Sequence, residues 1–273
     1  VLRAASNNAD FDVVAINGIT MAGETGFELH YPAVFKEAVH DAIMKVGEKY
    51  GIRELGYRSH QINHLEACFP TVGFHYMPAM WADDQEGFRT YLDEVGFIMQ
   101  FKIGGSYEGS DIRDYYRSPV EMGWADHIAF DHDFLGREAL ELEVNDPRRQ
   151  VVTLEFNSQD VQEVYASYFE EGEPYDFMNV PMQYQQIDHV DSVTRDGVFV
   201  GTSTSPGYSY YFRRVLAIAY LDVDVAELGT EVEVLWGNPG TRQKNIRAVV
   251  ARAPYKKDTR KIDLSSIPEN AST

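Results

Sequence analysis

The stretch that decides the fold runs from Val190 to Thr202 and has the sequence VDSVTRDGVFVGT. Two short runs rich in Val, Thr and Phe flank the dipeptide Asp196-Gly197. An Asp-Gly pair between two such runs is a strong signal for a two-residue hairpin, because both central residues of that turn take a positive φ. We therefore predict two antiparallel strands, at 190–194 and 198–202.

Four more runs in the second half of the chain have the character of strands. Each is short, rich in Val, Ile, Leu or Ala, and bounded by polar or turn-forming residues. They are residues 151–156, 215–221, 231–235 and 246–251. About six strands at this spacing are typical of an antiparallel barrel. The pattern changes at Asp146-Pro147, so we expect a boundary near 146 and a β-barrel domain at 147–273.

The first part, residues 1–146, combines helical and extended patterns. Apolar residues recur at helical spacing in three segments, and Asp133 is a candidate N-cap for a further helix. The three predicted helices are residues 32–50, about 56–68 and near 85–95. The chain therefore predicts an α+β fold, with a mixed α/β portion followed by a C-terminal antiparallel β-barrel domain.

The composition argues against several classes of protein. The 273 residues carry 43 Asp and Glu against 24 Lys and Arg, a formal charge of −19. This balance disfavours nucleic-acid binding, which needs clustered Lys and Arg. No run of about 18 apolar residues is present, so no membrane span is expected. Cys68 is the one cysteine, which excludes an internal disulfide and fits a reducing, cytoplasmic location.

Two histidines, His60 and His64, are four residues apart and so share one face of the predicted helix. This spacing occurs in zinc sites of the His-Glu-x-x-His type, but Gln61 stands where the glutamate is needed. The spacing suggests no third ligand, and we expect no metal site. An imidazole with an unperturbed pKa of about 6.5 suits proton transfer, although a structural role stays open for both histidines.

A carboxylate, Glu28, lies in an alternating segment between Phe27 and Leu29. On a strand the two apolar side chains face one side and Glu28 faces the other. A carboxylate there can accept two parallel hydrogen bonds from a planar pair of donors. A solvated strand face is the alternative for these residues.

Several stretches, in this order, resemble the folate-dependent aminomethyltransferase superfamily, which includes the T-protein of glycine cleavage. They are GETGFEL at 23–29, residues 56–67 ending in LEA, SPVEMGW at 118–124 with FLGREAL at 134–140, and VGTSTSP at 200–206 with AIAYL at 217–221 and APY at 253–255. Each motif is short, and the ordered set carries the resemblance.

The resemblance implies a ferredoxin-like, folate-binding portion in the mixed α/β part and tetrahydrofolate as the cofactor. It implies that Glu28 holds the pterin ring, whose edge presents an amino group and a ring N–H side by side. It also implies that the first part of the family's fold lies upstream of a strand such as 11–16. We therefore expect this sequence to be the downstream portion of a longer protein.

One departure from the T-protein pattern narrows the expected activity. The glycine-cleavage enzyme carries Arg-Asp before its Leu-Glu-Ala turn, whereas His60 and Gln61 stand here. The chain is more similar to bacterial tetrahydrofolate-dependent O-demethylases of vanillate and syringate. This implies that the methyl of a methoxylated aromatic acid passes to tetrahydrofolate, giving a phenol and 5-methyltetrahydrofolate. The alternatives are an aminomethyltransferase or N-demethylase of a glycine- or betaine-type amine, and a non-catalytic folate-binding or iron–sulfur-assembly protein of the same superfamily.

The O-demethylase resemblance assigns expected roles to four side chains near the second helix. Protonated His60 donates to the departing aryl oxygen, directly or through a water molecule. Phe69 is a candidate to stack on the cofactor or the substrate, and Tyr57 and His64 are candidates to bind substrate or to orient His60. The expected partners are a small aromatic substrate and folate, with no nucleic acid and no membrane.

Overall fold

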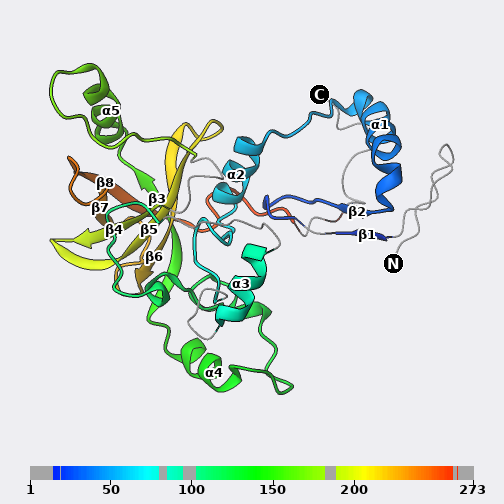
Figure 1. Cartoon of the computed structure of the whole chain (residues 1–273), viewed down its shortest axis with the longest axis horizontal. Coiled ribbons are helices and arrows are strands. Elements are labelled where there is room, and N and C mark those ends of the chain that lie inside the picture. The colour runs from blue at the N-terminus through cyan, green and yellow to red at the C-terminus, as the bar shows by residue number, and fades with distance from the viewer. Residues whose placement is uncertain are drawn as a thin grey trace.

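The computed structural model describes residues 15–18, 20–79, 85–94, 103–181, 189–260 and 263. Its strands fall into two groups: a two-stranded antiparallel sheet near the N-terminus, and a closed barrel in the second half of the chain. Figure 1 shows the barrel at one end of the molecule and helices α1 to α4 beside or below it. This arrangement confirms the predicted mixed portion followed by an antiparallel barrel.

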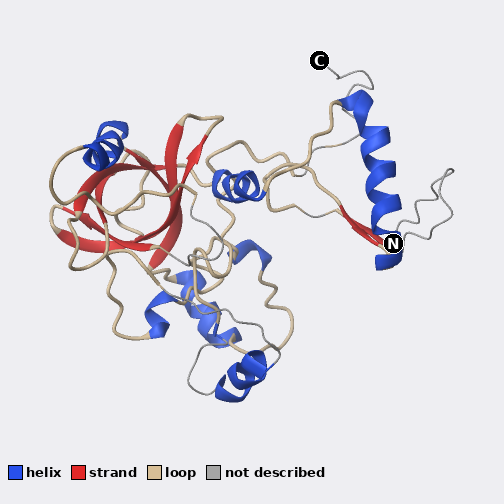
Figure 2. Ribbon diagram, turned by 45° about the horizontal axis from the view of Figure 1, so that its top comes forward, coloured by secondary structure: helices blue, strands red, loops and turns tan. Residues whose placement is uncertain are grey.

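Six strands form the barrel, and every pairing between them is antiparallel. They are β3 (Arg149–Phe156), β4 (Val190–Arg195), β5 (Val198–Ser209), β6 (Arg214–Asp222), β7 (Glu231–Trp236) and β8 (Lys244–Ala251). Their order around the barrel is β3-β6-β5-β4-β7-β8, and β8 closes on β3. Figure 2 shows this closed ring. Arg195 pairs with Val198 across the Asp196-Gly197 turn, as the hairpin signal predicted.

The barrel interior is the main apolar core, and β6 is buried on both faces. Inward-facing side chains such as Leu154 of β3 and Ala217 of β6 belong to the interior cluster. The alternate β6 residues Leu216, Ile218 and Tyr220 face outward but are also fully buried, because a helix covers them. A strand that is covered on both faces has a nearly continuous run of apolar residues, and the sequence of β6 shows such a run.

Five α-helices are described: α1 (Lys36–Gly47), α2 (Tyr57–Glu66), α3 (Glu86–Glu94), α4 (Arg137–Asn145) and α5 (Ser158–Ala166). The first three confirm the predicted helices, whereas α5 lies in a segment for which we predicted no element. Short 3₁₀ turns add Ala33–Phe35, Glu48–Tyr50, Ile112–Tyr115, Ala125–His127 and Ser167–Phe169. Strands β1 (Ala15–Asn17) and β2 (Glu28–His30) form the small sheet.

The prediction that Asp133 caps a helix is wrong. Helix α4 begins at Arg137, and its N-cap is Gly136, which adopts a left-handed φ of 89°. Asp133 lies one turn too early and instead pairs through Oδ1 with Nη1 of Arg137 at 3.3 Å. Glycine takes this backbone conformation without the cost that a β-carbon imposes.

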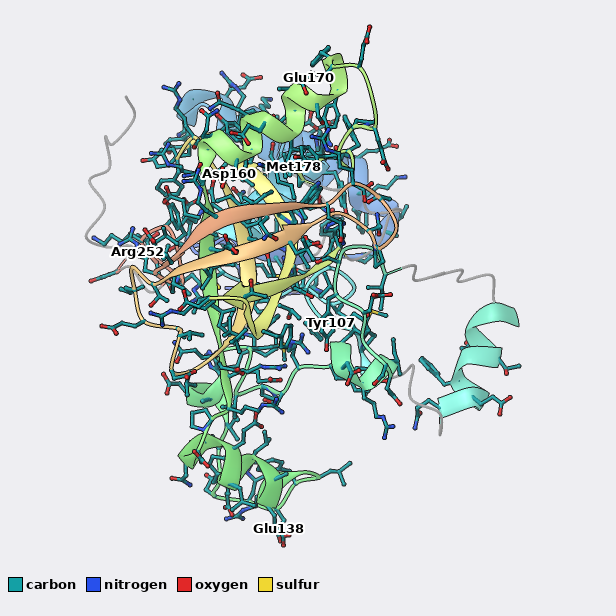
Figure 3. All side chains as sticks on the ribbon, turned by 90° about the vertical axis from the view of Figure 1, so that its left-hand side faces the viewer. Tyr107, Glu138, Asp160, Glu170, Met178 and Arg252 are labelled. Atoms are coloured by element: carbon teal, nitrogen blue, oxygen red, sulfur yellow. The ribbon has the colours of Figure 1, made fainter. Side chains whose placement is uncertain are left out.

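The helices take different positions around the barrel. In both Figure 1 and Figure 2, α2 lies beside the barrel, and β1, β2 and α1 lie farther out on the same side. In Figure 3, Asp160 marks α5 next to the barrel strands, and Glu138 marks α4 at the opposite end of the molecule. Arg247 of β8 donates to both carboxylate oxygens of Asp160, at 2.8 and 2.9 Å, which ties α5 to the barrel.

We expect Leu154→Ala to lower the free energy of unfolding by about 2–5 kcal/mol, because it leaves a cavity at a fully buried position. The matched control Leu228→Ala removes a side chain that is 65% exposed, and its effect should stay within about 0.5 kcal/mol. Chemical denaturation followed by circular dichroism measures both changes. Equal effects of the two substitutions would contradict the assignment of the core.

Candidate functional site

Helix α2 packs closely on the outer face of the barrel. Its Ile62 and Leu65 join the cluster formed by the outward side chains of β6. Gly207 of β5 permits this approach, since a β-carbon there would lie 2.6 Å from Cδ1 of Ile62. The Ser209 hydroxyl donates to Glu66 Oε1 at 2.6 Å, and this bond fixes the rotation of the helix about its axis.

The chain turns sharply at the end of α2. Cys68 has a left-handed φ of 46°, and the Phe69 amide donates to the carbonyl of His64 at 2.9 Å. Pro70 follows and cannot continue the helix. The turn brings the segment 71–76 back alongside α2, so that residues from both segments face a common space.

That space is a cavity of about 110 Å³ between α2, the segment after it and Ser205 of β5, where the pairing of β5 with β6 shifts register. Its walls are largely apolar, with several imidazoles and hydroxyls among them. The lining residues are Tyr57, His60, Gln61, His64, Leu65, Thr71, Phe74, His75, Pro181 and Ser205. An apolar cavity with a few convergent polar groups is the usual form of a small-molecule site.

The structure brings together three of the predicted site residues, His60, His64 and Tyr57. The imidazole rings of His60 and His64 meet edge to face, with centroids 4.1 Å apart. Gln61 donates to the Tyr57 hydroxyl at 2.8 Å, which holds that phenol at the cavity wall. His60 is exposed, whereas His64 is buried.

Burial controls the charge of the inner histidines. Burial, together with the neighbouring His60 ring, lowers the pKa of His64 from about 6.5 to about 4. Burial likewise lowers the pKa of His75 to about 3. Both rings are therefore neutral at physiological pH, and in the cavity they act as hydrogen-bonding groups rather than as cations.

Two further predicted residues lie outside the cavity lining. Phe69 packs against His64 with ring centroids 5.6 Å apart and against Trp124 at 5.9 Å, so it supports the cavity from behind. Glu28 lies on β2 with its side chain 49% exposed, and its Oε2 is 3.6 Å from Nε2 of His30. The roles predicted for both residues in cofactor binding stay predictions.

Among the cavity residues that sequence reasoning missed are Thr71, His75 and Ser205. Thr71 forms hydrogen bonds with both His64 and His75. The Ser205 hydroxyl donates to the Phe74 carbonyl at 2.7 Å, and the Ser205 backbone has a left-handed φ of 34°. A non-glycine residue at such a φ is uncommon and often marks a functional turn, but no sequence pattern shows it. The segment from Thr71 to His75 has no regular periodicity, so its packing against α2 could not be predicted from the sequence.

No three His, Cys, Asp or Glu side chains are grouped to hold a metal ion in the part of the chain that the structure describes. None of the helices in those residues has the length and apolar character needed to cross a membrane.

Two protein-family models match the chain. The GCVT N-terminal domain matches residues 4–81, and the glycine cleavage T-protein C-terminal barrel domain matches residues 178–256. The chain belongs to the glycine cleavage T-protein family. The second match contains β4 to β8 of the barrel, and the first contains α2 and the residues that follow it.

Two similar curated proteins act on aromatic compounds, according to their names. The chain is 34% identical to the sesamin methylene transferase of Sinomonas sp. (strain No.22), over 94% of this chain and 60% of that protein. It is 35% identical to the syringate O-demethylase of Sphingobium sp. (strain NBRC 103272 / SYK-6), over 86% of this chain and 53% of that protein. The chain thus spans a little over half the length of these relatives.

A solved structure shows the same fold. The aminomethyltransferase T of the glycine cleavage system from Bartonella henselae superposes with a TM-score of 0.55 at 16% sequence identity. The likeness covers 89% of this chain and 50% of that one. At this identity the match supports the architecture alone.

We expect the NMR signals of His64 and His75 to titrate with midpoints near pH 4 and pH 3, because burial opposes protonation of both rings. Between pH 6.5 and these midpoints the unfolded chain binds protons that the folded chain does not, so the free energy of unfolding should fall as the pH falls. A pH series of histidine ring spectra measures the midpoints. Exposed His40 is the internal control, since hydrogen bonds to Asp41 and Glu54 raise its pKa. Midpoints near 6.5 for the two buried rings would contradict the described cavity.

Proposed function

We propose that the protein is a tetrahydrofolate-dependent methyltransferase that removes the methyl group of a methoxylated aromatic acid of the syringate or vanillate type. The products are a phenol and 5-methyltetrahydrofolate. Support comes from family membership and from the relatives named syringate O-demethylase and sesamin methylene transferase. The observation that carries the proposal is the cavity beside α2, where aromatic walls meet three histidines.

The reaction needs a proton at the aryl oxygen when the methyl–oxygen bond breaks. His60 is placed to provide it, because its ring is open to solvent on one side and contacts His64 on the other. The Tyr57 and Phe74 rings in the wall suit a flat substrate. Exclusion of water from the inner cavity strengthens each hydrogen bond to the substrate.

Tetrahydrofolate, when bound, supplies N5 as the acceptor of the methyl group. The chemistry of Glu28 fits the pterin edge, since a carboxylate accepts two parallel N–H bonds and the Glu28 side chain is 49% exposed. We further propose that the folate-binding portion ends near residue 146 and that 147–273 form the barrel domain. A cytoplasmic location stays a prediction.

The second candidate is an aminomethyltransferase or N-demethylase acting on a glycine- or betaine-type amine. Its support is the more distant similarity to dimethylglycine dehydrogenase of Mus musculus, at 26% identity. A panel of vanillate, syringate, a methylenedioxyarene and dimethylglycine, incubated with tetrahydrofolate, separates the candidates by the product detected.

We expect His60→Ala to lower kcat for methyl transfer by at least about 100-fold, because the departing oxygen loses its proton donor. The Kd for tetrahydrofolate should stay within about threefold. Mass spectrometry of 5-methyltetrahydrofolate formed by the full-length protein measures kcat, and calorimetry measures Kd. His40→Ala is the matched control, since His40 lies on the exposed face of α1. Unchanged turnover in His60→Ala would remove this residue from the mechanism.

We expect Glu28→Ala to weaken tetrahydrofolate binding by about tenfold or more, because two hydrogen bonds to a charged acceptor are lost. Calorimetric titration of the full-length protein measures the change. Glu37→Ala, on exposed α1, removes the same charge elsewhere and should leave the affinity unaltered. Equal affinities of the Glu28 and Glu37 variants would exclude Glu28 from the cofactor site.

A further inference from the structure

Thr71 bonds to two histidines of the cavity through different groups. Its backbone N–H donates to Nδ1 of His75 at 2.9 Å. Its hydroxyl oxygen lies 2.9 Å from Nδ1 of His64 and 3.3 Å from the carbonyl oxygen of Phe69. Thr71 therefore forms a hydrogen bond with the Nδ1 atom of each ring, and both rings line the cavity.

The bond to His75 determines its tautomer. A backbone N–H can only donate, so Nδ1 of His75 must carry a lone pair. The ring is neutral because burial opposes protonation, and its single proton is therefore on Nε2. No residue in the described part of the chain bonds to that Nε2–H, which leaves it as a hydrogen-bond donor for a ligand.

The contacts of His64 favour the opposite tautomer. The carbonyl of Phe69 can only accept, and among the described residues the Thr71 hydroxyl is its one donor. That hydroxyl has a single proton, and when the Phe69 carbonyl takes it, the hydroxyl oxygen accepts from Nδ1–H of His64. The Nε2 atom of His64 then carries a lone pair, and no described residue donates to it.

We propose that Thr71 holds His64 and His75 in opposite tautomers, so that the cavity recognises an aromatic ring with a hydroxyl next to a methoxy group. His64 Nε2 accepts from the phenolic O–H, and His75 Nε2–H donates to the neighbouring ether oxygen. This inference rests on the proposed function and makes its substrate class specific. An arene with two ether oxygens, such as a dimethoxy or methylenedioxy compound, has no proton for His64 and leaves that lone pair unpaired.

The tautomers are directly observable. The full chain labelled with ¹⁵N-histidine should show, at pH 7, a protonated Nδ1 in His64 and a protonated Nε2 in His75 in long-range ¹H–¹⁵N spectra. Thr71→Val removes only the hydroxyl, so the His64 pattern should change while the His75 pattern, set by the backbone, should not. Thr71→Ser keeps the hydroxyl and should preserve both patterns. The same tautomer in both wild-type rings, or a His64 pattern unaffected by Thr71→Val, would overturn the proposal.

Ligand discrimination supplies the second measurement. We expect vanillate, which is 4-hydroxy-3-methoxybenzoate, to bind wild-type protein about tenfold more tightly than 3,4-dimethoxybenzoate or a methylenedioxybenzoate, the effect of one buried hydrogen bond. This preference should disappear in Thr71→Val and return in Thr71→Ser. Thr241→Val is the matched control, because that hydroxyl bonds only to the Asn238 carbonyl in an exposed turn.

The two proposals fail in different ways. Methyl transfer from vanillate without any preference over 3,4-dimethoxybenzoate would overturn the recognition of the hydroxyl and leave the proposed function intact. Tight, Thr71-dependent binding of vanillate without methyl transfer to tetrahydrofolate would overturn the proposed function and leave the recognition intact. Absence of binding of every arene in the panel overturns both.

Discussion

The contact on which the rest of the structure depends is the packing of α2 on the outer face of β6. Leu216, Ile218 and Tyr220 are excluded from water by Ile62 and Leu65, and burial of apolar surface of this kind contributes roughly 25 cal/mol per Å². Because side chains on a helix keep fixed angular positions, the face that packs on β6 determines where every other side chain of α2 lies. The histidines and the tyrosine of the cavity owe their placement to this contact.

The same packing explains the electrostatic character of the site. The segment that turns back after Pro70 carries His75 and contacts His64 through Thr71. Loss of water around both rings opposes their protonation. Neutral imidazoles recognise ligands through directed hydrogen bonds. His60, one turn before His64, remains open to solvent. One helix thus presents an exposed imidazole and a buried, neutral imidazole to the same space.

The barrel could be predicted from the sequence because its signals are local. The Asp196-Gly197 turn and the apolar runs at β6, β7 and β8 can each be recognised from a few consecutive residues. The site could not be predicted in full, since Thr71, His75 and Ser205 meet α2 through tertiary contacts that follow no sequence period. The capping error at Asp133 has a similar origin, because the choice of Gly136 depends on a backbone angle rather than on side-chain chemistry. His60, His64 and Tyr57 were found because they share one helix.

The double burial of β6 has a consequence for how the molecule opens. Its amides are bonded to β3 on one side and to β5 on the other, while side chains cover both of its faces. Amide hydrogens in such a strand exchange with solvent only when the whole unit unfolds, whereas the exposed ends of β2 and α1 can exchange through local fluctuations. Because α2 packs on β6, the cavity wall that α2 forms rests on a strand whose amides we expect to exchange slowly.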